Sequence, residues 1–137
     1  MFVIGETYRR RTMHDQYGGQ EQGGIATPTS QPVVWLFSGD TGEQYGYKDE
    51  WVDENTFRYY GEGQHGDMKF LRGNRAIRDH VKNAEHLHLF QRLGGGQVRF
   101  LGEMRLQKYD IEHGRDLNNQ MRDVIVFTLN RFESRIA

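Results

Sequence analysis

Short segments of apolar residues, several of them alternating with polar positions, recur along the chain and predict a protein made mainly of strands. The segment PVVWLFS is almost continuously apolar, which is typical of a strand buried on both faces. The segments EHLHLFQRL and QVRFLGEMRLQKY alternate instead, and Gly94–Gly96 form the turn between them. We expect about six strands, at approximately residues 2–9, 32–38, 56–61, 85–93, 97–109 and 122–132.

One segment, GNRAIRDHVKNA, has the periodicity of a helix. Asn74 is placed to cap its first turn, and Arg75 and Arg78 are expected to face solvent. Its inner stripe is expected to consist of Ala76, Ile77 and Val81. Residues 12–31 are polar and rich in glycine, and we expect a loop there. The elements together predict a β-dominated α+β fold, a curved mixed sheet or half-barrel with about six strands around one main helix, in a single domain over residues 1–137.

Composition narrows the possible functions. The chain has no cysteine, which excludes a disulfide framework, a thiolate metal site and a thiol nucleophile. It has no segment resembling a signal peptide or a membrane span, so we expect a cytoplasmic protein without a membrane partner. The formal net charge is -1. A nucleic-acid-binding protein of this composition must therefore gather its positive charge locally.

The segment YGYKDEWVDENTFRYYGEGQ, residues 45–64, combines tyrosines and a tryptophan with several carboxylates. A protein core would bury the rings and reject the acids, whereas a solvated loop would keep the acids and have few rings. Aromatic faces beside a few carboxylates suit a pocket that holds a flat, polar ligand. The segment is therefore the first candidate for a binding site.

Two groups of residues resemble catalytic or metal-binding arrangements, and each also has a simpler interpretation. His86 and His88 share one face of an expected strand, as metal ligands would, but alternation with leucine already explains a strand with one wet face. Asp53 followed by Asp67-x-Lys69 has the order of acids and lysine that many magnesium-dependent nucleases use to activate water. A solvated hairpin of alternating charge explains the same residues. We expect no catalytic residue, no metal site and no cofactor, and no phosphate-binding GxxxxGK motif is present.

Basic residues gather at the end of the first expected strand and around the start of the helix. Such clusters are usually solvated faces, but next to an aromatic pocket they could bind phosphates. The residues that we expect to contact phosphate are Arg9, Arg10, Arg72 and Arg75.

The order of several short motifs resembles the SRA (SET and RING associated) domain. These motifs are QGGI at 22–25, an apolar strand, YKD at 47–49, FRYYGEG at 57–63, GNRAI at 73–77 and GQVRFLG at 96–102. The similarity extends from about Gly5 to Phe132 and is closest to the SRA-like domains of bacterial modification-dependent restriction systems, a PUA-like fold that is often joined to an HNH nuclease. The resemblance implies a module that recognises 5-methylcytosine or 5-hydroxymethylcytosine and rotates that nucleotide out of the duplex.

The resemblance also implies roles for residues of the aromatic segment. Tyr47 and Tyr59 take the places of the two rings that sandwich the extruded base. Asp49 takes the place of the carboxylate that accepts a hydrogen bond from the cytosine amino group, and Glu50 is an alternative because the spacing is ambiguous by one residue. Without the resemblance, core packing would be the simpler interpretation of both tyrosines.

A loop before the GGI segment fills the gap left by the base in SRA domains. Gln22 takes that place here, and the loop also holds residues that we expect to line the groove: His14, Tyr17 and Gln20. Gln22 could equally be a polar turn residue. Animal members carry a long second finger that contacts the opposite strand, whereas residues 61–74 are short here, which puts a preference for hemimethylated sites in doubt.

The expected function is therefore a non-catalytic reader of modified cytosine that flips the base. The expected partners are double-stranded DNA carrying the modified cytosine and either a nuclease domain outside these residues or a second copy of the chain. Two alternatives come from other classes. One is a small standalone nuclease that uses Asp53, Asp67 and Lys69, and the other is an RNA-binding PUA-like module.

Overall fold

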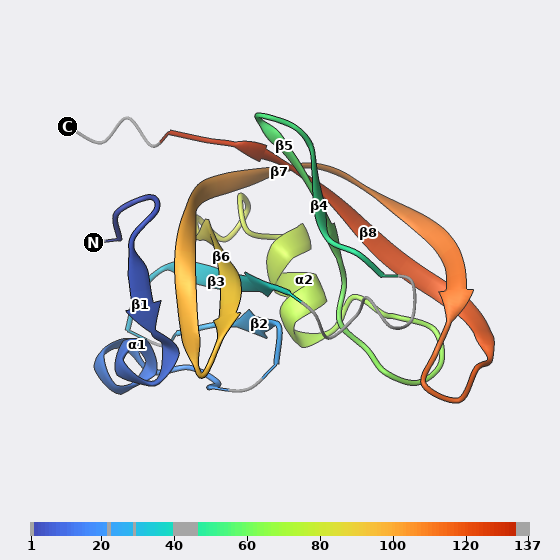
Figure 1. Ribbon diagram of the computed structural model, residues 1–137. Helices are drawn as coiled ribbons and strands as arrows, with labels where there is room; N and C mark the ends of the chain where they lie inside the picture. The colour runs from blue at the N-terminus through green and yellow to red at the C-terminus, as the bar shows by residue number, and fades with distance from the viewer. Residues whose placement is uncertain (1, 22, 29, 40–46, 134–137) are drawn as a thin grey trace.

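The structure is a computed structural model that describes residues 2–21, 23–28, 30–39 and 47–133. Eight strands and two helices lie within these residues (Figure 1). In chain order they are β1 (Thr7–Arg9), α1 (Arg10–Tyr17), β2 (Ile25–Ala26), β3 (Val33–Ser38), β4 (Glu50–Asp53), β5 (Thr56–Tyr60), α2 (Arg72–Arg78), β6 (His86–Gly94), β7 (Gln97–Arg115) and β8 (Met121–Arg131).

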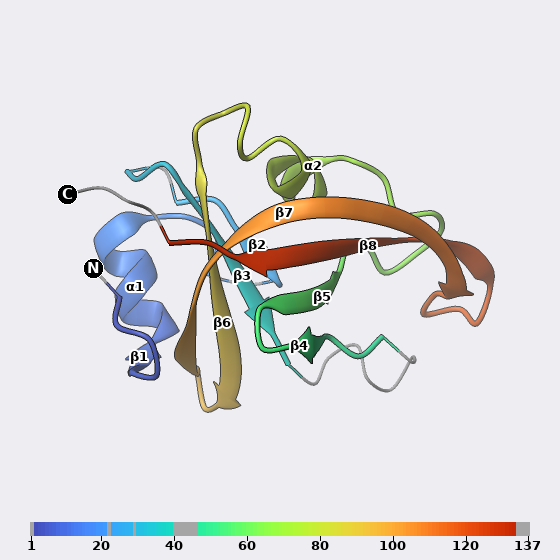
Figure 2. The same cartoon turned by 90° about the horizontal axis from the view of Figure 1, so that it is seen from above.

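All described strands join one mixed sheet in the order β2-β3-β6-β7-β8-β5-β4, and β1 pairs with the start of β7. β3 and β6 run parallel, and the other pairs are antiparallel. The first part of β7 pairs with β6 and the rest with β8, and the register shifts between Leu106 and Lys108. Figures 1 and 2 show β7 bending over the molecule between these two partners. The predicted class, a β-dominated α+β fold with a curved PUA-like sheet, is confirmed.

Apolar side chains pack on both faces of β3. Trp35 and Phe37 belong to a cluster that includes Met13 of α1, whereas Leu36 belongs to a second cluster that includes Ile77 of α2. These side chains are at most 3% exposed. The nearly continuous apolar pattern of this segment thus predicted the strand and its two buried faces correctly. Truncating a core ring such as Trp35 to alanine should cost about 3–5 kcal/mol of stability.

The first 31 residues differ from the expectation. The strand expected at residues 2–9 is limited to β1, and α1 begins at Arg10 and extends into the segment 12–31, which was expected to be a loop. The inner face of α1 includes Arg10 and His14, which are buried and bonded to each other (Nε to Nε2, 3.0 Å). Because two polar residues occupy core-facing positions, the helix has no apolar period to detect.

Two further strands that were not expected, β2 and β4, are short.

The second helix begins where expected but ends earlier. α2 ends at Arg78, and Val81, which was expected on its inner stripe, is 51% exposed. Asn74 does not cap the helix, because Leu71 occupies the N-cap position without a side-chain bond. Asn74 is instead buried inside the first turn and bonds to the backbone of a neighbouring loop. None of the helices in the described part of the chain has the length and apolarity needed to cross a lipid bilayer.

Candidate modified-base pocket

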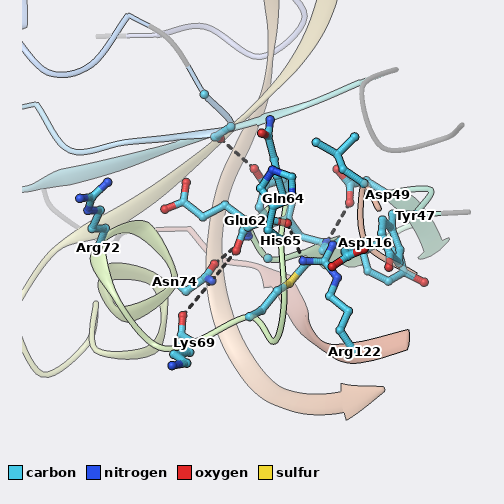
Figure 3. Close-up of a pocket in the computed structure, with 18 of the residues that line it drawn as sticks. Tyr47, Asp49, Glu62, Gln64, His65, Lys69, Arg72, Asn74, Asp116 and Arg122 are labelled. Carbon is cyan, nitrogen blue, oxygen red and sulfur yellow. Dashed lines mark hydrogen bonds between the residues drawn. The ribbon is translucent and has the colours of Figure 1, made fainter. Parts of the chain in front are cut away.

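An open cavity of about 1000 Å³ lies where the ends of several elements meet (Figure 3). Its walls come from the start of β2, the end of β3, the end of β5, the start of α2 and the hairpin between β7 and β8. Three of the four predicted pocket residues line it: Tyr47, Asp49 and Tyr59. The described part of this segment, residues 47–64, therefore contributes to a cavity with aromatic and acidic walls.

Asp49 presents a half-buried carboxyl group to this cavity. Its Oδ1 atom accepts a hydrogen bond from the backbone N–H of Tyr60 at 2.8 Å. Burial raises the pKa of Asp49 to about 7, while the Tyr60 hydrogen bond and the charge of Arg92 act in the opposite direction. Glu50 is exposed on β4 opposite Arg58 and is not among the residues lining the cavity. The structure thus separates the two rival carboxylates and places only Asp49 at the cavity.

Tyr47 is held against the β7–β8 hairpin. Its hydroxyl group donates a hydrogen bond to the carbonyl oxygen of Arg115, and its ring lies 5.3 Å from the ring of Tyr60 and under the guanidinium of Arg122. A Cβ atom at Gly114 would lie 2.5 Å from the Tyr47 hydroxyl oxygen, so any other residue there would displace the Tyr47 ring. The orientation of the Tyr47 ring is therefore set by residues far from it in the sequence.

Tyr59 is anchored more deeply. It is 3% exposed and belongs to the core cluster shared with α2. Its hydroxyl group bonds to the carbonyl oxygens of Gly24 at 2.8 Å and Phe37 at 3.2 Å, and burial raises its pKa well above the usual value. Tyr59 therefore serves as core and as cavity wall at once.

The turn that follows β5 is attached to α2 through Asn74. The Asn74 Oδ1 atom accepts from the N–H of Glu62 (2.9 Å), and Nδ2 donates to the carbonyl oxygens of Glu62 (2.9 Å) and Lys69 (3.0 Å). The Glu62 carboxylate accepts from the N–H of Gly73, and burial raises its pKa. A Cβ atom at Gly61 would lie 2.9 Å from Asn74 Oδ1, which explains the glycine before Glu62. The Gly-Glu-Gly pattern was the available signal for this second cavity carboxylate.

Two side chains join the cavity wall formed by residues 63–67 to the β7–β8 hairpin (Figure 3). Arg122 is 6% exposed and donates to the carbonyl oxygens of Gly63 and Gly66. Asp116 is 5% exposed and accepts from the N–H of Gly66, and this bond with two others from its own hairpin lowers its pKa. Sequence reasoning missed both residues, because nothing local marks a bond across more than fifty positions.

The described residues among those expected in the flipping loop differ in burial and in contacts. Gln22 lies outside the described residues. His14 is 7% exposed, its Nδ1 lies 3.0 Å from the carbonyl oxygen of Gly18, and burial lowers its pKa. The ring of Tyr17 packs against Trp35. His14 and Tyr17 do not line the cavity, and their expected place along a DNA groove stays a prediction. Gln20 is exposed, and its Oε1 accepts from the N–H of Thr27 at 3.1 Å, so it braces the loop.

The basic residues that were expected to contact phosphate differ in burial and position. Arg10 is 9% exposed, donates to the carbonyl oxygens of Gly23 and Gln20 at 2.8 and 3.1 Å, and lies over the Phe37 ring, and burial lowers its pKa to about 10. Arg10 thus uses donors on all three of its guanidinium nitrogens inside the fold, and its expected contact with phosphate stays a prediction. Arg9 is exposed on β1, at the opposite end of the molecule from the β7–β8 hairpin (Figure 1).

Exposed positive charge at the cavity comes from three other positions. Arg72, which was expected to contact phosphate, lines the cavity together with Lys69 and Arg115. Arg75 is exposed on the same helix as Arg72. The Arg115 side chain also donates to the carbonyl oxygen of Asn119.

The residues of the nuclease alternative are not assembled. Asp67 and Lys69 line the cavity, but Asp53 accepts from the N–H of Asn55 in the β4–β5 turn and does not line it. Within the described residues, no group of three or more histidine, aspartate or glutamate side chains could hold a metal ion. His86 lies 2.7 Å from Glu103, and burial lowers the pKa of its neighbour on the strand, His88, to about 4.

Comparison with known families identifies the domain. The family model described as the ScoMcrA-like SRA domain matches residues 4–137. The chain belongs to this SRA family. The resemblance noted in the order of the sequence motifs is thereby confirmed, and the curated proteins contain no significant match.

Solved structures share the fold of this SRA domain at low sequence identity. The sulfur binding domain and SRA domain of ScoMcrA, complexed with phosphorothioated DNA, is 24% identical with a TM-score of 0.77, covering 98% of this chain and 41% of that one. The SUVH5 SRA domain complexed with hemimethylated CG DNA is 18% identical with a TM-score of 0.69, covering 100% and 92%. The modification-dependent restriction endonuclease AspBHI is 14% identical with a TM-score of 0.72, covering 99% and 43%. The SRA domain thus corresponds to less than half of the two restriction proteins.

Proposed function

We propose that this SRA domain is a DNA-binding reader that recognises 5-methylcytosine or 5-hydroxymethylcytosine by flipping the base into the cavity at Asp49. The observation that carries the proposal is a half-buried carboxyl group on the wall of a cavity that aromatic rings also line. Family membership and the similarity to SRA domains bound to modified DNA support it.

The chemistry of Asp49 fits the Watson–Crick edge of cytosine. One carboxyl oxygen is occupied by the N–H of Tyr60, which fixes the group and leaves Oδ2 for a ligand. An ionised oxygen accepts from the cytosine N4 amino group, a bond that the O4 oxygen of thymine cannot supply. This hydrogen bond, with stacking on Tyr47 and contact with the small exposed part of Tyr59, offsets the pairing and stacking lost on extrusion.

The wall chemistry favours a modified base over a modified backbone. A phosphorothioate has the same negative charge as the phosphate that it replaces and has no hydrogen-bond donor for the carboxyl groups of Asp49 and Glu62 that line the cavity. A cytosine base, in contrast, offers the hydrogens of its N4 amino group to such an acceptor. The similar ScoMcrA structure, which was complexed with phosphorothioated DNA, contains a sulfur binding domain in addition to its SRA domain.

Basic residues at the cavity and beside it hold the phosphate backbone of the duplex. Lys69, Arg72 and Arg115 at the cavity, with Arg75 beside them, are the phosphate-binding residues of this proposal. Gln22 is the proposed residue that fills the gap left by the base. We propose that the domain works in a cytoplasmic restriction system. The DNA is cut by a nuclease domain outside this chain, or by a nuclease that assembles through a second copy of the chain.

A comparison of four duplexes tests the proposal. They share one sequence and carry cytosine, 5-methylcytosine, 5-hydroxymethylcytosine or a phosphorothioate linkage at one position. We expect at least tenfold tighter binding to one of the two modified cytosines than to cytosine, and no gain from the phosphorothioate. Equal affinity for all four, or a preference for the phosphorothioate, contradicts the proposal. Preferential binding of the matching RNA duplex would favour the RNA-binding alternative.

A further inference from the structure

The hairpin between β7 and β8 reaches back to the cavity and is bonded to its edge. We name residues 63–67 the rim loop and residues 115–120 the hairpin tip. Asp116 Oδ2 of the tip accepts from the N–H of Gly66 at 2.9 Å. Arg122, just after the tip, donates to two carbonyl oxygens of the rim loop at 2.7 and 3.1 Å. The two segments, far apart in sequence, therefore form one surface (Figure 3).

Further bonds join the same two segments. The N–H of Leu117 donates to the carbonyl oxygen of Gln64 at 3.0 Å, and the Asn118 side-chain nitrogen lies 3.3 Å from Nδ1 of His65. The second bond orients the Asn118 amide group through a rim-loop side chain. The joined surface is thus held by backbone and side-chain bonds together.

The hairpin tip also has a fixed internal conformation. Asp116 Oδ1 accepts from the N–H groups of Asn118 and Gln120 at 2.9 and 3.0 Å. Asn119 adopts a left-handed backbone conformation with φ of 61°, which asparagine tolerates better than most residues. The side chain of Arg115 donates to the carbonyl oxygen of Asn119 at 3.0 Å. A loop with this many internal bonds presents its outer side chains in defined positions.

Four of the exposed side chains of the joined surface are amides, and they lie among His65, Asp67, Arg115 and Leu117. Gln64, Asn118 and Gln120 are exposed, and Gln64 and Leu117 also line the cavity. A base that enters this cavity leaves its duplex at the cavity mouth, so the adjacent base pairs lie against the rim. Asparagine and glutamine amides form paired hydrogen bonds with N6 and N7 of adenine in the major groove.

We propose that the hairpin tip and the rim loop together read the base pairs that flank the modified cytosine, with Gln64, Asn118 and Gln120 selecting adenine. This inference rests on the proposed function, because it uses the position that a duplex takes when its base occupies the cavity. The cavity selects the modified base, and the joined surface selects the sequence around it.

The test is a binding survey of duplexes with one 5-methylcytosine and each of the four base pairs at the three positions on either side. Wild type is compared with Gln64→Ala, Asn118→Ala and Gln120→Ala. The matched control is Gln107→Ala, which removes an exposed amide on β7 that does not line the cavity. We expect wild type to favour an adenine at one or more positions by about five- to hundredfold. At least one of the three variants should lose that preference, and the control should keep it.

Two ratios separate this inference from the proposed function. The ratio between 5-methylcytosine and cytosine at a fixed flank measures cavity recognition and should stay unchanged in the three rim variants. The ratio between flanks at a fixed modification measures the joined surface. Equal binding of all flanks by wild type, or a preference that persists in all three variants, overturns the inference. If wild type binds 5-methylcytosine and cytosine duplexes equally, that result overturns the proposed function instead. The ratio between flanks, measured on cytosine duplexes, then still decides the role of the joined surface.

Discussion

Replacing Asp49 by asparagine should make the protein more stable and a poorer reader. Asparagine has nearly the same shape and keeps an oxygen that accepts from the N–H of Tyr60, so the main change is the loss of an ionisable group at the cavity. The wild-type pKa, raised by burial to about 7, shows that the ionised form is unfavourable in the folded protein.

The sign and size of the stability effect follow from linkage. Because the folded pKa lies above the unfolded value, the contribution of Asp49 to stability is fully present below about pH 4 and is lost as the pH rises through 7. A rise from 3.8 to about 7 corresponds to roughly 4 kcal/mol, and solvent at the open cavity reduces this to about 2–4 kcal/mol. Asp49→Asn should therefore gain stability relative to wild type as the pH rises from 5 to 8.

Urea unfolding at several pH values, together with DNA titrations, measures both effects. The matched control for binding is Glu50→Gln, which neutralises the exposed neighbouring carboxylate outside the cavity and should leave the preference for modified duplex unchanged. We expect Asp49→Asn to bind 5-methylcytosine duplex about 10- to 100-fold more weakly, with little change on unmodified duplex. A stability difference that is constant with pH refutes the electrostatic reasoning, and an equal loss on both duplexes refutes the role of Asp49 in base recognition.

Three further predictions concern stacking, scaffold and charge. Tyr47→Ala should weaken binding to modified duplex by about 1–3 kcal/mol while Tyr47→Phe keeps most of it, measured by DNA titration; equal losses would show that the ring does not stack. Asn74→Ala removes three bonds to backbone groups and should lower the free energy of unfolding by about 2–4 kcal/mol in urea; a change below about 0.5 kcal/mol would mean that water replaces them. Arg72→Gln should reduce the salt slope of binding by about one while Arg9→Gln leaves it unchanged, and identical slopes would remove Arg72 from the DNA interface.

The sequence predicted those parts of the fold that depend on local apolar pattern. β3 is an example, because its side chains alternate between two cores and each core demands an apolar residue. α1 could not be predicted in the same way. Its buried face includes Arg10 and His14, which satisfy each other and nearby carbonyl groups, so polar residues occupy positions that a pattern assigns to solvent.

The candidate site shows the same division. The resemblance of the motif order to SRA domains predicted Tyr47 and Asp49 as pocket residues, and both line the cavity. The roles of Asp116 and Arg122 depend on bonds to a loop that precedes them by about fifty residues, and only the folded sheet brings those segments together. Arg10 and Arg72 were indistinguishable as charges in the sequence, and their burial alone separates them.

Fluorescence of a base analogue tests base flipping most directly. A fluorescent cytosine analogue at the target position of a duplex is quenched by stacking, and extrusion changes its emission. We predict a clear change in emission when wild type binds the duplex, and a smaller change when a folded Asp49→Asn protein binds it. Tight binding by wild type with no change in emission would contradict base flipping and leave the cavity without its proposed ligand.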